Sequence, residues 1–61
     1  METHAQKFNV GDLVKIKWSS VRFIVLEASW LRNSTMYEYT LYSPNINDLI
    51  YAKEILIDKI E

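Results

Sequence analysis

The sequence predicts a small all-β protein, a barrel of five strands, on three observations. Its only glycine, Gly11, belongs to a turn and is followed at once by alternating apolar and basic side chains over residues 12–18. Residues 21–30 are rich in β-branched and aromatic side chains, and residues 36–43 alternate cleanly between two faces. Alternation with a period of two favours strands over helices.

The first expected strand covers residues 12–18. Because successive side chains of a strand point to opposite faces, every second residue belongs to the same face. The face that we assign to the core carries Val14, Ile16 and Trp18. For Trp18, and for Trp30, core packing and partial exposure stay open as alternatives, because one small barrel does not easily enclose all of its aromatic rings. The outer face carries Leu13, Lys15 and Lys17.

Residues 21–30 form the longest expected strand, and its apolar pattern is too wide for one face. Val21, Phe23 and Val25 alternate with Arg22, Ile24 and Leu26. Since Ile24 and Leu26 would then point outward, either both faces are partly covered or a β-bulge near residues 27–28 shifts the phase.

A hairpin loop over residues 31–35 and a third strand over residues 36–43 follow. Asn, Ser and Thr side chains bond to their own backbone, which favours the loop between two β-prone segments. One face of the third strand carries Tyr37, Tyr39 and Leu41, and the other carries Met36, Glu38, Thr40 and Tyr42. Pro44 marks the next turn, over residues 43–48.

The C-terminal segment has two interpretations. In the first, residues 49–53 form a fourth strand, a 3₁₀ turn follows at residues 52–54, and residues 55–60 close the sheet as a fifth strand. In the second, residues 48–61 form one helix capped by Asp48, beside a sheet of three to four strands. The isoleucines and the wide apolar arc favour the strands.

Length and composition predict a single domain over residues 8–61 with a flexible tail over residues 1–7. The chain has 61 residues and no cysteine, so a dense apolar core or self-association must supply the stability that disulfides or zinc supply elsewhere. The 49% of hydrophobic residues favours the dense core. The N-terminal residues lack the apolar segment of a signal peptide, and no segment has membrane-spanning length. We therefore expect a cytoplasmic protein.

The residues needed for catalysis are scarce. His4 is the only imidazole, the acidic residues show no paired spacing, and a single glycine cannot form a phosphate-binding loop. We therefore expect no enzyme activity, no cofactor, no metal site and no small-molecule substrate.

Three segments carry a resemblance to a known family. They are Phe8, Val10-Gly11-Asp12, Val14 and Ile16 near the start, Tyr37-Glu38-Tyr39-Thr40-Leu41 in the middle and Ala52-Lys53-Glu54-Ile55-Leu56 at the end. Their order resembles the SH3-like small barrels, including the KOW-type branch of ribosomal and transcription proteins. The chain departs from that branch at Ser19-Ser20-Val21, where KOW-type proteins have a second glycine. In size and style the chain is also similar to compact phage and prophage proteins that bind one host protein.

Two functions follow from these observations. The first is a non-enzymatic protein-binding module that covers a surface of another protein or pairs with itself. Its apolar anchors would be Trp18, Ile24, Leu26, Trp30, Met36 and Tyr42, and its rim charges Lys15, Lys17 and Arg22. The second is an RNA- or DNA-binding barrel that uses the same three basic residues with exposed aromatic rings. The net charge of −1 favours the first.

Overall fold

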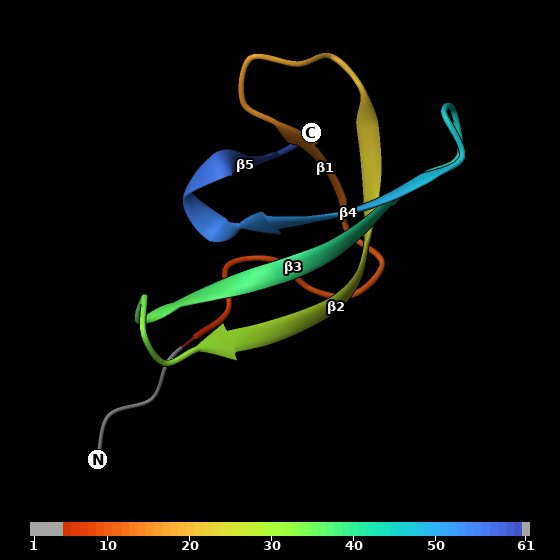
Figure 1. Cartoon of the computed structure of the whole chain (residues 1–61). Coiled ribbons are helices and arrows are strands. Elements are labelled where there is room, and N and C mark those ends of the chain that lie inside the picture. Colours follow the sequence, from red (N-terminus) through yellow and green to blue (C-terminus); the bar gives the residue numbers. More distant parts are fainter. Residues whose placement is uncertain (1–4, 61) are drawn as a thin grey trace.

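The computed structural model describes residues 5–60 (Figure 1). Within that range the regular structure consists of strands and one 3₁₀ turn. The elements are β1 (Leu13–Ile16), β2 (Arg22–Leu31), β3 (Met36–Ser43), β4 (Asp48–Lys53), η1 (Glu54–Leu56) and β5 (Ile57–Lys59). The all-β prediction is therefore confirmed. The first four residues of the expected tail, including His4, lie outside the described residues.

The strands form one antiparallel sheet in the order β4-β3-β2-β1-β5. Figure 1 shows the sheet bent around the core, with the long, curved β2 running from one end of the molecule to the other. The sheet is not closed, because β4 and β5 do not pair with each other and each forms an edge. After β4 the turn η1 carries the chain to β1, where Lys17 donates its N–H to the Leu56 carbonyl at 2.9 Å. The structure thus establishes a five-stranded sheet, and not the closed barrel that the sequence predicted.

The first strand is shorter than predicted, which places Trp18 outside the core. Ser19 donates its N–H to the Ile16 carbonyl at 3.1 Å and Trp18 has a φ of 69°, so residues 16–19 form a turn. The indole is 87% exposed. The assignment of Trp18 to the core face is therefore wrong, because a period of two does not continue through a turn. Val14 is fully buried and Ile16 packs against the core, as predicted.

β2 contains the bulge that its apolar pattern suggested. The pairing with β3 shifts between Val25 and Glu27, which leaves Leu26 as the extra residue, just before the position expected. The odd-numbered residues face the core before the bulge, and the even-numbered ones face it afterwards. Trp30, which lies opposite Tyr37, therefore belongs to the inner face.

The C-terminal segment is β-structure, and the alternative helix is wrong. Residues 48–53 pair with β3 along their whole length, and residues 57–59 pair with β1. The 3₁₀ turn lies at residues 54–56, two positions later than predicted, because Ala52 is held on the inner face opposite Tyr39. The last strand is correspondingly shorter.

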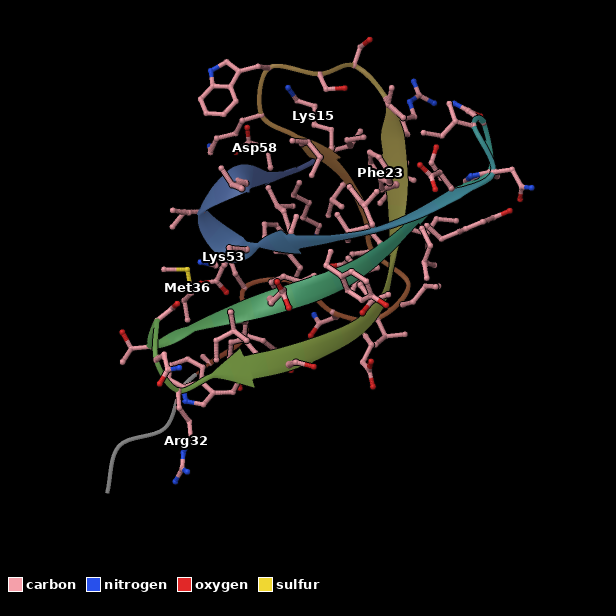
Figure 2. The ribbon with its side chains drawn as sticks, in the orientation of Figure 1. Lys15, Phe23, Arg32, Met36, Lys53 and Asp58 are labelled. Atoms are coloured by element: carbon pink, nitrogen blue, oxygen red, sulfur yellow. The ribbon has the colours of Figure 1, made fainter. Side chains whose placement is uncertain are left out.

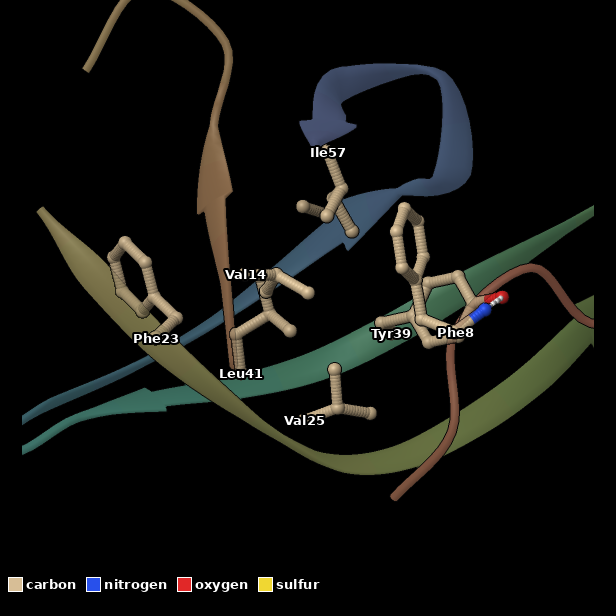
Figure 3. Close-up of a cluster of buried hydrophobic side chains, with 8 residues drawn as sticks. Phe8, Val14, Phe23, Val25, Tyr39, Leu41 and Ile57 are labelled. Carbon is tan, nitrogen blue, oxygen red and sulfur yellow. Dashed lines mark hydrogen bonds between the residues drawn. The ribbon is translucent and has the colours of Figure 1, made fainter. Parts of the chain in front are cut away.

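The core combines residues from every strand with one residue that precedes β1 (Figure 3). Its buried members are Phe8, Val14, Phe23, Val25, Tyr39, Leu41, Ala52 and Ile57. The ring of Phe8 meets that of Tyr39 edge to face, with centroids 5.3 Å apart. Phe8, from the segment before β1, therefore completes the core on the inner side of the sheet.

The hydroxyl of Tyr39 joins three parts of the chain. It accepts the N–H groups of Lys7 at 3.0 Å and Phe8 at 3.2 Å, and it donates to Oε2 of Glu54 at 3.0 Å. Burial raises the pKa of Tyr39, so the hydroxyl keeps its proton for Glu54 at neutral pH. This one oxygen fixes the segment before β1 and the turn η1 to the middle of the sheet.

Gly11 occupies the turn that the sequence predicted. Its φ of 94° lies in the region that side chains disfavour, which accounts for glycine at this position. Its N–H donates to the Val25 carbonyl at 2.8 Å, and the N–H of Val25 donates to the Asp12 carbonyl at 3.0 Å. The turn therefore holds β2 next to the bulge.

Candidate interface on the outer face of the sheet

An apolar row crosses four strands on the outer face. Leu13 of β1 lies opposite Ile24 of β2. Ile24 lies opposite Tyr42 of β3, and Tyr42 lies opposite Leu49 of β4. Residues that lie opposite each other in antiparallel strands project from the same face, and the sequence neighbours of these residues on β1, β2 and β3 are in the core. We call Leu13, Ile24, Tyr42 and Leu49 the apolar row.

The side chains of the apolar row are accessible to a partner. Leu13 is 39% exposed and Leu49 is 47% exposed, while Ile24 and Tyr42 between them are half-buried. Leu26, pushed out by the bulge, and Tyr51, 65% exposed, lie on the next positions of β2 and β4. The exposed apolar surface is therefore continuous across the sheet and not scattered.

Basic residues border the apolar row on one side. Lys15 lies opposite Arg22, one step along β1 and β2 from the row. Lys15 also lies opposite Asp58 of β5, and Figure 2 shows these two residues at the same end of the molecule. Nζ of Lys17 donates to Oδ1 of Asp58 at 2.7 Å, and this bond holds the pKa of the Asp58 carboxyl below its ordinary value. Of the three predicted rim charges, Lys17 is therefore already engaged within the chain.

The other side of the apolar row carries residues of mixed charge. Glu27 lies opposite Thr40, and the following step places Glu38 opposite Lys53. An apolar centre with a charged and polar border is the usual anatomy of a protein-binding patch.

The structure brings together Ile24, Leu26 and Tyr42 among the six predicted anchors. Met36 shares the outer face but lies about 20 Å from Tyr42 along β3, given a rise of about 3.4 Å per residue. Figure 2 accordingly shows Met36 well away from Lys15. Trp30 lies on the inner face, where its ring meets that of Tyr37 edge to face with centroids 5.1 Å apart.

Trp18 is exposed at a separate place, in the turn between β1 and β2. The backbone N–H of the preceding residue, Lys17, is bonded to Leu56 of η1, so this turn lies beside η1 and away from the apolar row. A positive φ in a bulky residue is uncommon and costs backbone energy. The structure thus separates Trp18 from the other predicted anchors.

The sequence patterns did not identify three exposed residues of this apolar surface as anchors: Leu13, Leu49 and Tyr51. Leu13 had been placed on the outer face, but nothing in its own segment links it to Ile24. The link depends on the register between strands, which loop length and bulge position decide together. The sequence signal that points to Leu13 as an anchor is that it shares the outer face of its strand with Lys15 and Lys17.

Over residues 5–60 no group of three or more His, Asp or Glu is placed to hold a metal ion, and no pocket opens. The same residues form no helix with the length and apolar character needed to cross a membrane.

Comparisons of the chain with family models, curated proteins and solved structures found no significant match.

Proposed function

We propose that this chain is a non-enzymatic protein-binding module that contacts its partner through the apolar row, on a sheet of the SH3-like kind. The observation that carries the proposal is the alignment of Leu13, Ile24, Tyr42 and Leu49 across four hydrogen-bonded strands. In support of the family, the strand order returns β5 to β1, and a 3₁₀ turn precedes that last strand.

The apolar row has the physical properties of a binding surface. Its side chains are fixed on paired strands, so little conformational entropy is lost when a partner covers them. Each residue is already partly shielded by its neighbours, which lets a partner complete the burial and exclude water. A folded partner with its own apolar patch is the occupant that this continuous surface fits.

The border of the row indicates how the partner would be oriented. Lys15 and Arg22 border the row on β1 and β2, and Glu27 lies on its other side. A partner with acidic groups next to its apolar patch would be attracted to the first side and repelled from the second. Such charges fix orientation and raise the association rate more than they raise affinity.

The test uses a variant that removes exposed apolar surface without touching the core. The double variant Leu13→Ser, Leu49→Ser removes the apolar side chain at each end of the row. If a partner buries about half of each leucine, the loss is about 1 kcal/mol per residue, or about 30-fold in the dissociation constant for the pair. The measurement is capture of proteins by the tagged chain from nuclease-treated lysate of the organism that encodes it, followed by titration of the purified partner.

The matched control is Val10→Ser with Ile55→Ser, which removes apolar side chains that are even more exposed, from turns outside the row. We expect the control to bind like the wild type. Equal binding by the row variant and the wild type would refute the role of the row. Binding that disappears on nuclease treatment, and that falls when Lys15 and Arg22 are replaced by Gln, would instead identify a nucleic-acid-binding protein.

A further inference from the structure

β4 is an open edge of the sheet, and it is built unlike the other edge. β4 has six residues without proline, and its outward side chains Leu49 and Tyr51 are apolar or aromatic and exposed. β5 has three residues and carries Asp58 and Lys59. Short length and charge are the usual protections of an edge strand against pairing with another chain, and β4 has charges only at its two ends, Asp48 and Lys53.

The backbone hydrogen bonds of β2 show which N–H and C=O groups point toward β1 and which point toward β3. Val25 donates its N–H to Asp12 and accepts the N–H of Gly11, so both of its backbone groups point to the β1 side. Backbone groups alternate in direction along an antiparallel strand. Ile24 and Tyr42, which lie opposite each other, therefore direct their backbone groups toward one another.

The same alternation continues to the open edge. Leu41 of β3 faces Ile50 of β4, so Leu49 and Tyr51 direct their N–H and C=O groups away from the sheet. An independent observation agrees, because the N–H of Leu49 is bonded to Oδ1 of its neighbour Asp48 at 2.9 Å. Among the described residues, no other segment extends the sheet beyond β4. The edge thus presents a template for one more antiparallel strand.

We propose that a second copy of this chain fills this edge, with the two β4 strands antiparallel about a two-fold axis at Ile50. Leu49 of each copy then lies opposite Tyr51 of the other, and these two residues exchange backbone hydrogen bonds with their counterparts. The N–H of Leu49 exchanges its exposed bond to Asp48 for a carbonyl of the second copy.

A second copy complements this edge, because the exposed Leu49 of each copy meets the exposed Tyr51 of the other and no like charges meet. Asp48 lies opposite Ala52 of the second copy, and Lys53 lies opposite Asn47. A two-fold axis at Tyr51 would instead place Asp48 opposite Glu54 of the second copy. The register centred on Ile50 avoids that contact between like charges.

This pairing goes beyond the proposed function and leaves Leu13, Ile24 and Tyr42 of the apolar row uncovered, while Leu49 at the end of the row also meets Tyr51 of the second copy. The bonds that form it lie in the plane of the sheet, whereas the side chains of the row project from the outer face. The dimer would carry two rows on one continuous sheet, and a partner with two sites would bind it with greater avidity. Because only one short strand from each copy pairs, the interface is small and the dimer dissociates on dilution.

The first test is the mass of the untagged wild-type protein by sedimentation equilibrium, at concentrations up to millimolar. We expect the mass to rise from monomer toward dimer. Leu49→Lys with Tyr51→Lys places lysines opposite one another, and we expect a dissociation constant at least about 30-fold higher. A wild type that stays monomeric at every concentration overturns the proposal.

The control for added charge is Leu13→Lys with Leu26→Lys, which makes the same change on β1 and β2, away from the edge. We expect this control to dimerise like the wild type. Equal weakening by both double variants would show that overall charge or the outer face drives association, and would overturn pairing along β4. No partner protein is present, so the result is independent of the test of the apolar row.

The register is tested by cysteine cross-linking, since the chain has no cysteine of its own. Ile50→Cys places two thiols opposite each other, so we expect a disulfide-linked dimer under mild oxidation. Tyr51→Cys places them on a diagonal about 7–8 Å apart, beyond easy bridging, and exposed Val10→Cys reports random collision. Cross-linking at Tyr51 or Val10 that is as fast as at Ile50 would overturn the register.

Discussion

Replacing Tyr39 with Phe removes one oxygen from the molecule and tests the bond network that holds the N-terminal segment. The variant keeps the ring, and with it the edge-to-face contact with Phe8. It removes the acceptor for the N–H groups of Lys7 and Phe8 and the donor to Glu54. The expected result is a less stable protein with the same fold.

The magnitude follows from what each group can bond to afterwards. The N–H of Lys7 still has Oε2 of Glu54 at 3.2 Å, and Glu54 remains accessible to water. The N–H of Phe8 is buried and loses its partner, which costs about 1–3 kcal/mol. We expect the free energy of unfolding to fall by about 2 kcal/mol, a large part of the roughly 3–9 kcal/mol expected for a domain of this size.

The assay is urea unfolding followed by tryptophan fluorescence. With a slope of about 1 kcal/mol per molar urea, the midpoint should fall by about 2 M. Tyr42→Phe is the matched control, because its hydroxyl donates to Asn47 in an exposed bond, and we expect a change below about 0.5 kcal/mol. A fall of the Tyr39→Phe midpoint no larger than that of this control would refute the reasoning.

The raised pKa of Tyr39 gives a second readout with a defined sign. A folded-state pKa above the ordinary value of 10.0 stabilises the fold at lower pH, and that stability is lost as pH rises through the folded pKa. The wild type should therefore lose stability above pH 10 more steeply than Tyr39→Phe does.

Two further predictions concern Ser43 and the pair Lys17–Asp58. Ser43 is fully buried on the inner face and its hydroxyl has no hydrogen-bond partner among residues 5–60, so Ser43→Ala should leave stability unchanged or raise it by about 1 kcal/mol in the same urea assay. A loss of about 1 kcal/mol or more would show that the hydroxyl is bonded. Lys17→Met should return the pKa of Asp58 toward its ordinary value of 3.8, measured by NMR titration of the carboxyl carbon. A lowered folded-state pKa stabilises the fold at pH values above 3.8, and this stability is lost as pH falls through the folded-state pKa. The free energy of unfolding of the variant should therefore depend less on pH in this acid range. An unchanged Asp58 titration would contradict the role of Lys17.

Local patterns in the sequence were sufficient for the main strands. Alternation over residues 36–43 matches the bounds of β3, and it assigns Tyr39 and Leu41 to the core correctly. Gly11 marks a turn that needs a positive φ. The surplus of apolar residues after Phe23 indicated either a strand covered on both faces or a bulge, and the structure contains the bulge. Each of these signals is local, since it depends on the covalent direction of neighbouring side chains.

The wrong predictions arise where a sequence pattern does not reveal how the backbone continues or what it pairs with. Trp18 follows Val14 and Ile16 in perfect alternation, yet a turn that begins at Ile16 exposes it. The helix alternative for the C-terminus is wrong because residues 48–53 form backbone hydrogen bonds with β3, and residues 57–59 form them with β1. Sequence periodicity carries no information on these bonds, because their partners lie in strands distant in the chain.

The sequence by itself determined an all-β chain, the turn at Gly11, the inner residues of β3 and the presence of outward apolar side chains such as Ile24 and Tyr42. Only the tertiary structure decided that these two residues line up with Leu13 and Leu49, and that β4 is left as an open edge. The physical reason is that alternation fixes the face on which a side chain lies, whereas its neighbours across the sheet depend on the register of hydrogen bonds between strands.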